Sequence, residues 1–395
     1  MIRTTNVRDG WVDTINVKYV EEEVYKKWIR RGAPIKGDVI LTREAPLGEV
    51  GLLRNDEGVF LGQRLVMYRA NPKKLDNRFL LYSFLHSDLQ GQIKSFGSGS
   101  TVEHMRVPDC EKLIIKLPPL PTQRKIASIL STYDDLIENN TRRIKILEEM
   151  AQAIYREWFV NFRFPGHEQI RMVDSPLGKV PEGWKVVPLE FLITEHIGGG
   201  WGKEESEDYF TEPAWVIRGT DIPGVRHCQY DSVPLRYHTV SNLKSRRLKP
   251  CDIVFEVSGG SKGQPVGRSL FITNQLLSAF GEDDVICASF CKRVEPKREI
   301  YRAEILYSSF VEGYTSGEID QYQVQSTGIT NFKWTEYLQQ AQRAVPLREL
   351  QDSFCDIAGP IFTQIATVGL KTANLRKTRD LLLPRLISGQ LEIKI

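Results

Sequence analysis

The chain has 395 residues, of which 41% are hydrophobic and 26% are charged. This is the composition of a folded globular protein and excludes a disordered or fibrous chain. Its net charge of +3 is too small to indicate nucleic-acid binding by itself. At roughly 100–200 residues per domain, we expect two or three domains. The sequence contains no run of about 18 apolar residues, so we expect no membrane span. Its six scattered cysteines fit a reducing, cytoplasmic setting.

The sequence contains an internal repeat, in which short segments recur in the same order. The matching pairs are Ile2–Val7 with Ile217–Ile222, Lys36–Ile40 with Pro250–Val254, Ser100-Thr101 with Ser326-Thr327, and Pro118 and Gln123 with Pro346 and Gln351. Each match is weak alone, and their shared order is what indicates a repeat. Chance similarity between short β-rich segments is the alternative.

Two segments, 1–117 and 161–345, carry short Val, Ile, Phe and Tyr runs broken by Gly, Asp and Asn, as in DVILTR (38–43) and DIVFEV (252–257). Such runs predict strands. Each segment also contains a helical stretch, at 77–96 and 303–319. We therefore expect an α+β fold with two pseudo-repeated mixed α/β domains. Cys287 and Cys291 are expected on one strand, as buried thiols.

Two long helices, at 118–160 and 346–395, are predicted to follow these domains. From Thr122 to Trp158 there is no Pro or Gly, and apolar residues recur at steps of three and four, which is a heptad pattern. The predicted helix-pairing residues are Ile126, Leu130, Tyr133, Ile137, Asn140, Ile144, Leu147 and Ile154 in the first helix, and Phe354, Ile361, Ile365, Val368, Leu375 and Leu382 in the second.

The shared register of the two helices predicts an antiparallel coiled coil within the chain. Thr372 and Arg379 weaken the second pattern, Pro360 is expected to kink that helix, and Pro384 to end it. The alternative is two amphipathic helices, each packed on its own domain.

The sequence lacks the motifs that would carry chemistry. There is no D/N/S-P-P-Y/F loop of an amino-methyltransferase and no phosphate-binding G-x-x-x-x-G-K-S/T loop. The six cysteines include no C-x-x-C pair, and the six histidines form no metal-spaced pair. We therefore expect no catalytic residue, no metal site and no cofactor in this chain.

Basic residues cluster at one position of each repeat, before the strands that begin near Gly37 and Cys251. The two groups are Lys26, Lys27, Arg30 and Arg31, and Lys244, Arg246, Arg247 and Lys249. They predict contacts to DNA phosphates, and a solvated charged face is the alternative. Further candidates, which could read base edges or cap turns, are Arg3, Ser100, Thr101, His104, Arg218, Lys262, Ser326, Thr327 and Lys333.

Four segments together resemble the specificity subunit of type I restriction-modification systems, and the resemblance covers nearly the whole chain. They are LPPLPTQRKIASIL (117–130), AIYREWFVNFRFPGHE (153–168), LGKVPEGWKVVPL (177–189) and LRKTRDLLLPRLISGQLEI (375–393). The resemblance implies that 1–117 and 161–345 are target recognition domains. Each would read one half of a bipartite, asymmetric site in double-stranded DNA.

The resemblance also implies that the helices act as a spacer of fixed length. They would dock two methyltransferase subunits, which restriction (translocase and nuclease) subunits join. S-adenosylmethionine, ATP and Mg²⁺ would then belong to those partners. Only Met1 precedes Ile2, whereas 184–215 precede the matching segment of the second half, so we expect the first domain to be truncated at its N-terminus. The alternatives are a recognition part of a fused restriction-methylation enzyme and a coiled-coil adaptor without DNA contact.

Overall fold

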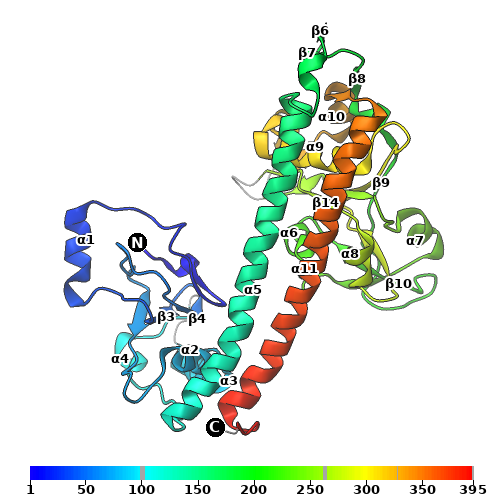
Figure 1. Ribbon diagram of the computed structural model, residues 1–395. Helices are drawn as coiled ribbons and strands as arrows, with labels where there is room; N and C mark the ends of the chain where they lie inside the picture. The colour runs from blue at the N-terminus through cyan, green and yellow to red at the C-terminus, as the bar shows by residue number, and fades with distance from the viewer. Residues whose placement is uncertain (98–102, 261–264, 327, 394–395) are drawn as a thin grey trace. The chain divides into compact units, whose positions relative to one another are not determined.

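The computed structural model describes residues 1–97, 103–260, 265–326 and 328–393 and separates into two compact units. Unit 1 comprises Met1–Ile137 and Leu375–Ile395, and unit 2 comprises Glu138–Asn374. Two long helices, α5 (Leu120–Tyr155) and α11 (Arg348–Ser388), each contribute to both units (Figure 1). The predicted mixture of strands with two long helices is confirmed.

Unit 1 is built on a five-stranded sheet with the order β1-β2-β4-β3-β5. Its strands are β1 (Val7–Arg8), β2 (Gly10–Val12), β3 (Val39–Arg43), β4 (Leu47–Leu52) and β5 (Leu65–Tyr68). β3 has antiparallel neighbours on both sides, whereas β2 and β4 pair in parallel. The apolar run of β3 is buried at every residue except the last, as expected for a strand covered on both faces.

Two helices, α2 (Asn77–Leu85) and α3 (Ser87–Phe96), pack against this sheet. Unit 1 also contains α1 (Glu22–Trp28) and α4 (Val107–Cys110). The Asp76 side chain caps α2 by accepting hydrogen bonds from the backbone N–H groups of Arg78 and Phe79, which would otherwise lack partners. Phe79 of α2 is fully buried in one apolar cluster with Leu41 of β3. The helical stretch predicted at 77–96 is therefore confirmed, as two helices.

Unit 2 holds several small sheets, with the orders β14-β12-β16-β9, β11-β10-β15, β13-β18-β17, β19-β8 and β6-β7. The strands are β6 (Met172–Ser175), β7 (Gly178–Pro181), β8 (Lys185–Pro188), β9 (Ile193–Gly198), β10 (Glu212–Ile217), β11 (Leu235–His238), β12 (Ile253–Glu256), β13 (Ser258–Gly259), β14 (Ser269–Phe271), β15 (Asp284–Cys287), β16 (Cys291–Pro296), β17 (Gln323–Ser326), β18 (Ile329–Phe332) and β19 (Gln342–Val345). The helices are α6 (Ile222–Arg226), α7 (Val240–Arg246), α8 (Asn274–Ser278), α9 (Ala303–Ser316) and α10 (Trp334–Gln340).

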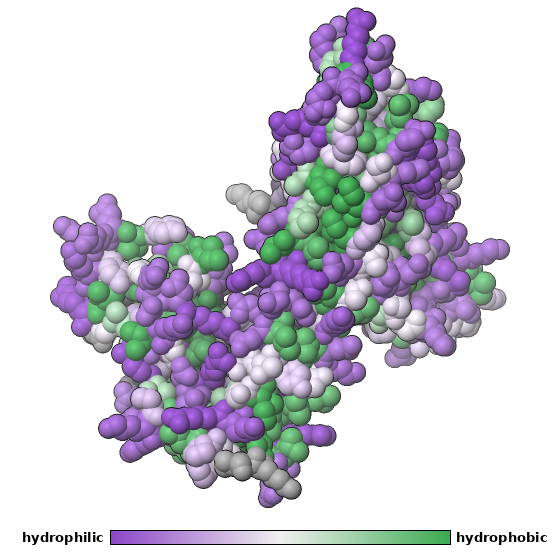
Figure 2. Space-filling view, in the orientation of Figure 1, coloured by the Kyte–Doolittle hydropathy of each residue, from purple (hydrophilic) through white to green (hydrophobic). Residues whose placement is uncertain are grey.

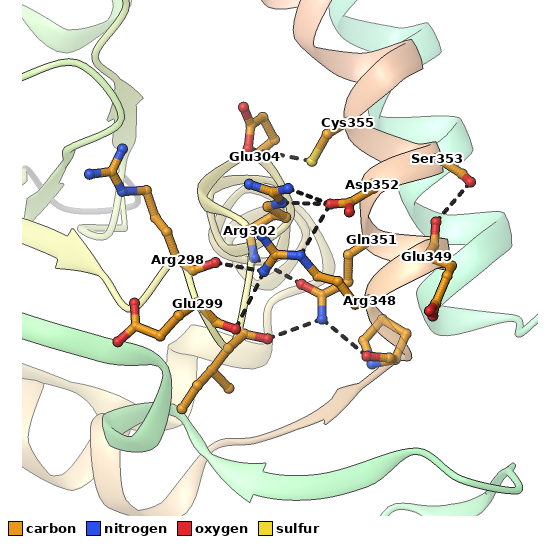
Figure 3. Close-up of polar contacts among 12 residues, drawn as sticks. Arg298, Glu299, Arg302, Glu304, Arg348, Glu349, Gln351, Asp352, Ser353 and Cys355 are labelled. Atoms are coloured by element: carbon orange, nitrogen blue, oxygen red, sulfur yellow. Dashed lines mark hydrogen bonds and ion pairs between the residues drawn. The ribbon is translucent and has the colours of Figure 1, made fainter.

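A buried glutamine fixes the start of each long helix. In unit 1, Gln123 Nε2 donates to the carbonyls of Lys74 and Pro118, and its Oε1 accepts from the backbone N–H of Asp76. In unit 2, Gln351 makes the same three kinds of bond, with Ile300, Pro346 and Arg302 (Figure 3). Arg302 adds an ion pair with Asp352. Each glutamine thus ties the first turns of its helix to the residue that precedes a shorter helix, α2 or α9.

A buried aspartate stands before an interior strand of each unit, β3 in unit 1 and β12 in unit 2. Asp38 accepts the backbone N–H of Ile35 at 2.9 Å and pairs with the guanidinium of Arg69 at 2.7 Å. Asp252 accepts the backbone N–H of Lys249 at 2.8 Å and lies 3.4 Å from Arg293 Nε. The bonds to the N–H groups of Ile35 and Lys249 close a turn and satisfy carboxylate oxygens that burial would otherwise penalise. Arg293 Nε itself has no hydrogen-bond partner among the described residues.

The two long helices pack against each other inside each unit. In unit 1, Ile126 and Leu130 of α5 share an apolar cluster with Leu386 of α11. In unit 2, Ile144 and Leu147 of α5 share a cluster with Ile365 of α11. The early part of α5 therefore meets the late part of α11, and the late part of α5 meets the middle of α11.

Two predictions about local structure were wrong. α11 continues through Pro384 to Ser388, because Leu383 and Leu386 bury this last stretch in the unit 1 cluster, and packing outweighs the lost hydrogen bond. Cys287 and Cys291 lie at the end of β15 and the start of β16, on two strands in different sheets. Both thiols are buried as expected, and burial raises the pKa of Cys287 to about 12.

Among the described residues, α11 is the one helix long and apolar enough to cross a membrane by length and composition. A core helix passes the same test. Phe354, Ile365 and Leu386 of α11 are each less than 10% exposed inside the folded units. One third of the most apolar window of α11 is buried inside the folded structure.

Candidate nucleic-acid interface

Unit 2 carries a β-hairpin whose base is fixed by the core. β13 follows β12 after a single residue and pairs antiparallel with β18, which pairs with β17. The backbone N–H of Phe332 donates to the carbonyl of Val257 at 2.9 Å, and the Phe332 ring is buried in the apolar cluster of unit 2. The hairpin therefore extends from a fixed base.

One face of this hairpin points to solvent. The register pairs Val324 with Asn331 and Ser326 with Ile329, and side chains two residues apart share a face. All four of these side chains are exposed, whereas Phe332 on the other face is buried. Residues 323–332 include no charged residue, so this face can hydrogen-bond and make apolar contacts but cannot neutralise a phosphate.

A hydrogen bond fixes the amide of Asn331. Ser258, which lies opposite it on β13, donates its hydroxyl to Asn331 Oδ1 at 2.8 Å, and Ser258 is only 9% exposed. An amide oxygen has two lone pairs, and its NH₂ group has two donors. Asn331 can therefore still present one acceptor position and its donors to a ligand.

Unit 1 has a corresponding feature at His104. An isolated antiparallel bridge joins His104 to Glu44, the residue after β3. The backbone N–H of Met105 donates to the carbonyl of Arg43 at 2.9 Å, and Met105 is fully buried. The exposed residue before this buried anchor is His104 in unit 1 and Asn331 in unit 2. The two units thus present different polar side chains in similar surroundings.

Arg3 and Arg218, predicted to contact DNA, lie in different electrostatic environments. The guanidinium of Arg218 donates to both carboxylate oxygens of Asp221 at 2.8 Å, so its charge is already neutralised. The backbone N–H of Arg3 bonds to the neutral Asn6 side chain. Arg3 Nε is buried without a hydrogen-bond partner among the described residues. Asp221 therefore makes Arg218 the poorer candidate for binding a phosphate.

The first basic group surrounds the short helix α1. Lys26, Lys27 and Arg30 are exposed, but Glu22 pairs with Lys26 at 2.6 Å, and Glu23 lies on the same turn. Local acidic residues therefore offset much of this positive charge. The side chain of Arg31 lies outside the description, as do the predicted DNA-contacting residues Ser100, Thr101, Lys262 and Thr327.

The second basic group lies at the end of α7 and divides into two kinds of residue. Arg246 Nε donates to the carbonyl of Gly198 at 2.9 Å, and Arg247 pairs with Asp284. Lys244 and Lys249 are exposed and have no side-chain partner within the described part of the chain. The lysines are therefore free to bind phosphates, whereas Arg246 holds the neighbouring β9 segment.

The remaining predicted DNA contacts lie at the hairpin. Ser326 is exposed at the end of β17. Lys333 follows β18, is exposed, and forms an ion pair with Glu336 of α10 at 2.9 Å. Ser326 therefore shares the outward face of the hairpin, while Lys333 lies just beyond its base.

The predicted helix-pairing residues are buried or partly buried. Those that are buried are Ile126, Leu130, Ile137, Ile144, Leu147, Phe354, Ile361, Ile365 and Val368; those that are partly buried are Tyr133, Asn140, Ile154, Leu375 and Leu382. The outward sides of the helices also carry apolar residues, among them Ile146, Met150 and Ile357 in unit 2, each more than 40% exposed. Figure 2 shows apolar surface on the visible face of unit 2.

Sequence reasoning missed two arrangements. Asn331 belongs to the outward hairpin face but was not among the predicted residues; the alternation within QVQS (323–326) and ITNF (329–332), on either side of a Thr-Gly pair in the sequence, was the available signal. Arg379 was taken as a weak point in the helix pairing, yet its Nη1 lies 2.8 Å from Asp134 Oδ1. Among the described residues, no group of three or more His, Cys, Asp and Glu side chains could hold a metal ion.

The chain resembles known proteins over most of its length. Residues 12–149 match the type I restriction modification DNA specificity domain. The MjaIX specificity subunit of Methanocaldococcus jannaschii is 26% identical over 95% of this chain and 82% of its own. The EcoKI specificity subunit of Escherichia coli is 26% identical over 40% of this chain and 31% of its own.

A solved structure shows the same fold. The S subunit of a type I restriction-modification system from M. genitalium superposes with a TM-score of 0.53 at 15% identity, covering 91% of this chain and 84% of its own. This likeness agrees with the sequence matches over nearly the full length of the chain. In sequence and in fold, the chain is therefore similar to the specificity subunits of type I restriction-modification systems.

Proposed function

We propose that this chain reads a bipartite, asymmetric site in double-stranded DNA, one half with each recognition domain. The domains are residues 1–117 and 161–345, and the helical segments are 118–160 and 346–395. The observation that carries the proposal is the matched pair of exposed positions, His104 and Asn331, each held by a buried neighbour. Two domains that recognise different DNA sequences require different side chains, here His104 and Asn331, at equivalent positions.

The two domains are pseudo-repeats in this proposal, and three sets of bonds support it. Gln123 and Gln351 make the same three contacts at the start of their helices. Asp38 and Asp252 each close a turn before an interior strand, β3 or β12, and pair with an arginine. The backbone N–H of Arg3 and of Arg218 each bond to the side chain three residues later.

The helices serve as the spacer and as the docking surface. We propose that α5 and α11 form an antiparallel coiled coil, because the buried residues of each helix recur with heptad spacing. The exposed apolar residues on their outward sides provide area for partner proteins. These partners are two methyltransferase subunits, which restriction subunits join.

As a specificity subunit, the chain is a non-catalytic component. We place S-adenosylmethionine, ATP and Mg²⁺ in the partner subunits, and the assembly in the cytoplasm. A gel-shift titration of the full chain with random duplex DNA tests the proposal. Binding at low salt that weakens as salt rises is expected. No binding would favour the adaptor without DNA contact, and methyl transfer by the pure chain with S-adenosylmethionine would favour the fused enzyme.

A further inference from the structure

We infer that the outward face of the β17–β18 hairpin is the base-reading surface of unit 2, and that it recognises A·T pairs in the major groove. The face consists of Val324, Ser326, Ile329 and Asn331. This inference rests on the proposed DNA recognition. It further names the hairpin that contacts the bases, the residues involved and the base pair that these residues select.

The shape and the lack of charge of the hairpin suit contact with base edges in the major groove of DNA. A two-stranded antiparallel ribbon is one of the two elements that the major groove of B-DNA, about 12 Å wide, admits. Residues 323–332 are uncharged, so the ribbon itself would not hold phosphates, which contribute most of the sequence-independent affinity. Its exposed groups suit base edges, which carry the sequence information.

Asn331 supplies the hydrogen-bonding part of the recognition. An asparagine reads adenine by accepting a bond from N6 and donating one to N7. Because Ser258 donates to Asn331 Oδ1 at 2.8 Å, the amide is already oriented, and its second lone pair and NH₂ group remain for adenine. Orientation before binding reduces the entropy lost on forming the two bonds.

Val324 and Ile329 supply the apolar part. Their side chains are 45% and 41% exposed. A single exposed apolar side chain is ordinary on a protein surface, but these two lie on either side of the oriented amide of Asn331. The methyl group at C5 of thymine is the apolar feature of the major groove. An amide next to two branched aliphatic side chains therefore matches adenine and thymine better than guanine and cytosine.

The test is selection of bound sequences from a random duplex library by the full chain. Asn331→Asp keeps an acceptor for Ser258 but removes the donor for adenine N7, and a carboxylate accepts from N4 of cytosine. We expect preference for adenine at one position to fall about ten- to a hundred-fold, with cytosine gaining. Ile329→Ala, a surface change, should lower preference for thymine at a neighbouring position.

Gln339→Glu is the matched control, since it makes the same amide-to-carboxylate change at an exposed position on α10. It should leave the selected sequence unchanged. If the native chain selects a motif that neither hairpin variant alters, or that lacks an A·T pair at the affected position, the inference is overturned while DNA recognition stands. If the native chain selects no motif, the proposed function fails as well.

Discussion

Asp134 of α5 and Arg379 of α11 form a nearly buried ion pair inside unit 1. Arg379 Nη1 lies 2.8 Å from Asp134 Oδ1, and the hydroxyl of Tyr82 donates to Asp134 Oδ2 at 2.6 Å. The carboxylate is 8% exposed and the guanidinium 21%. Burial, followed by the charge of Asp134, raises the pKa of Tyr82. The network joins α2, α5 and α11 in one register.

Removing Arg379 tests this network. Arg379→Ala leaves the carboxylate of Asp134 buried beside a hydroxyl alone, and we expect it to reduce the free energy of unfolding by about 3–5 kcal/mol. Replacing both residues by leucine, together with Tyr82→Phe, should recover most of that loss, because an apolar set carries no desolvation cost and leaves no buried hydroxyl unpaired. Chemical denaturation of the full chain measures both effects.

Arg385→Ala is the control for this experiment, since Arg385 is an exposed arginine on the same part of α11. It should change the free energy of unfolding by no more than about 0.5 kcal/mol. Equal effects of Arg379→Ala and Arg385→Ala would show that the ion pair contributes nothing to helix pairing.

A charge between the helices of unit 2 should separate them. Ile144→Asp or Leu147→Asp buries a carboxylate at the α5–α11 contact, at a cost of several kcal/mol, and we expect a lower denaturation midpoint and loss of methyltransferase docking. Asn140→Leu should be tolerated or stabilising, because a polar residue at such a position mainly sets register. Ile146→Asp, on the exposed side of the same helix, should leave the midpoint unchanged. A midpoint shared by the Ile144, Leu147 and Ile146 variants would contradict the helix pairing.

The long helices and several strands could be predicted from the sequence, because the spacing of apolar residues follows directly from which side of an element is buried. Ile126 and Leu130 are buried as their spacing predicts. The burial of Asp134 was not predicted, because a lone acidic residue in a heptad pattern is normally solvent-exposed. Only the fold places its partner Arg379, 245 positions later in the sequence, beside it. The pairing of Arg218 with Asp221, three residues later, was also not predicted, because it depends on a turn geometry that composition does not specify.

Two lysines of the second basic group should carry its phosphate contacts. We expect Lys244→Ala with Lys249→Ala to weaken binding to all duplex sequences alike and to flatten the salt dependence by about two phosphate contacts, with unchanged stability. Arg246→Ala should instead destabilise unit 2, because the carbonyl of Gly198 loses its donor. Titrations at several salt concentrations measure the first effect and thermal denaturation the second. An unaltered salt slope in the lysine variant would place these residues outside the interface.

Asp252 should make stability depend on pH. Burial raises its pKa to about 6, more than the neighbouring Arg293 lowers it. Between about pH 4 and pH 6 the folded chain therefore binds more protons at this site than the unfolded chain. The contribution of this site to the free energy of unfolding falls as pH rises through that range.

Asp252→Asn removes this titration. Its free energy of unfolding should therefore rise relative to the native chain by about 2–3 kcal/mol from pH 4 to pH 6 and then stay level. Asp231→Asn, at an exposed position, should follow the native curve throughout. Parallel curves for Asp252→Asn and the native chain would contradict the assignment to Asp252.

The most direct test of the account is an exchange of one recognition domain. Residues 185–345 are replaced by the corresponding segment of another specificity subunit, and the chimera is expressed with a methyltransferase partner. Mapping the methylated sites should show a split target in which one half is replaced, while the other half stays that of the native chain. A target in which both halves change, or neither does, would contradict the proposal that each unit reads its own half-site.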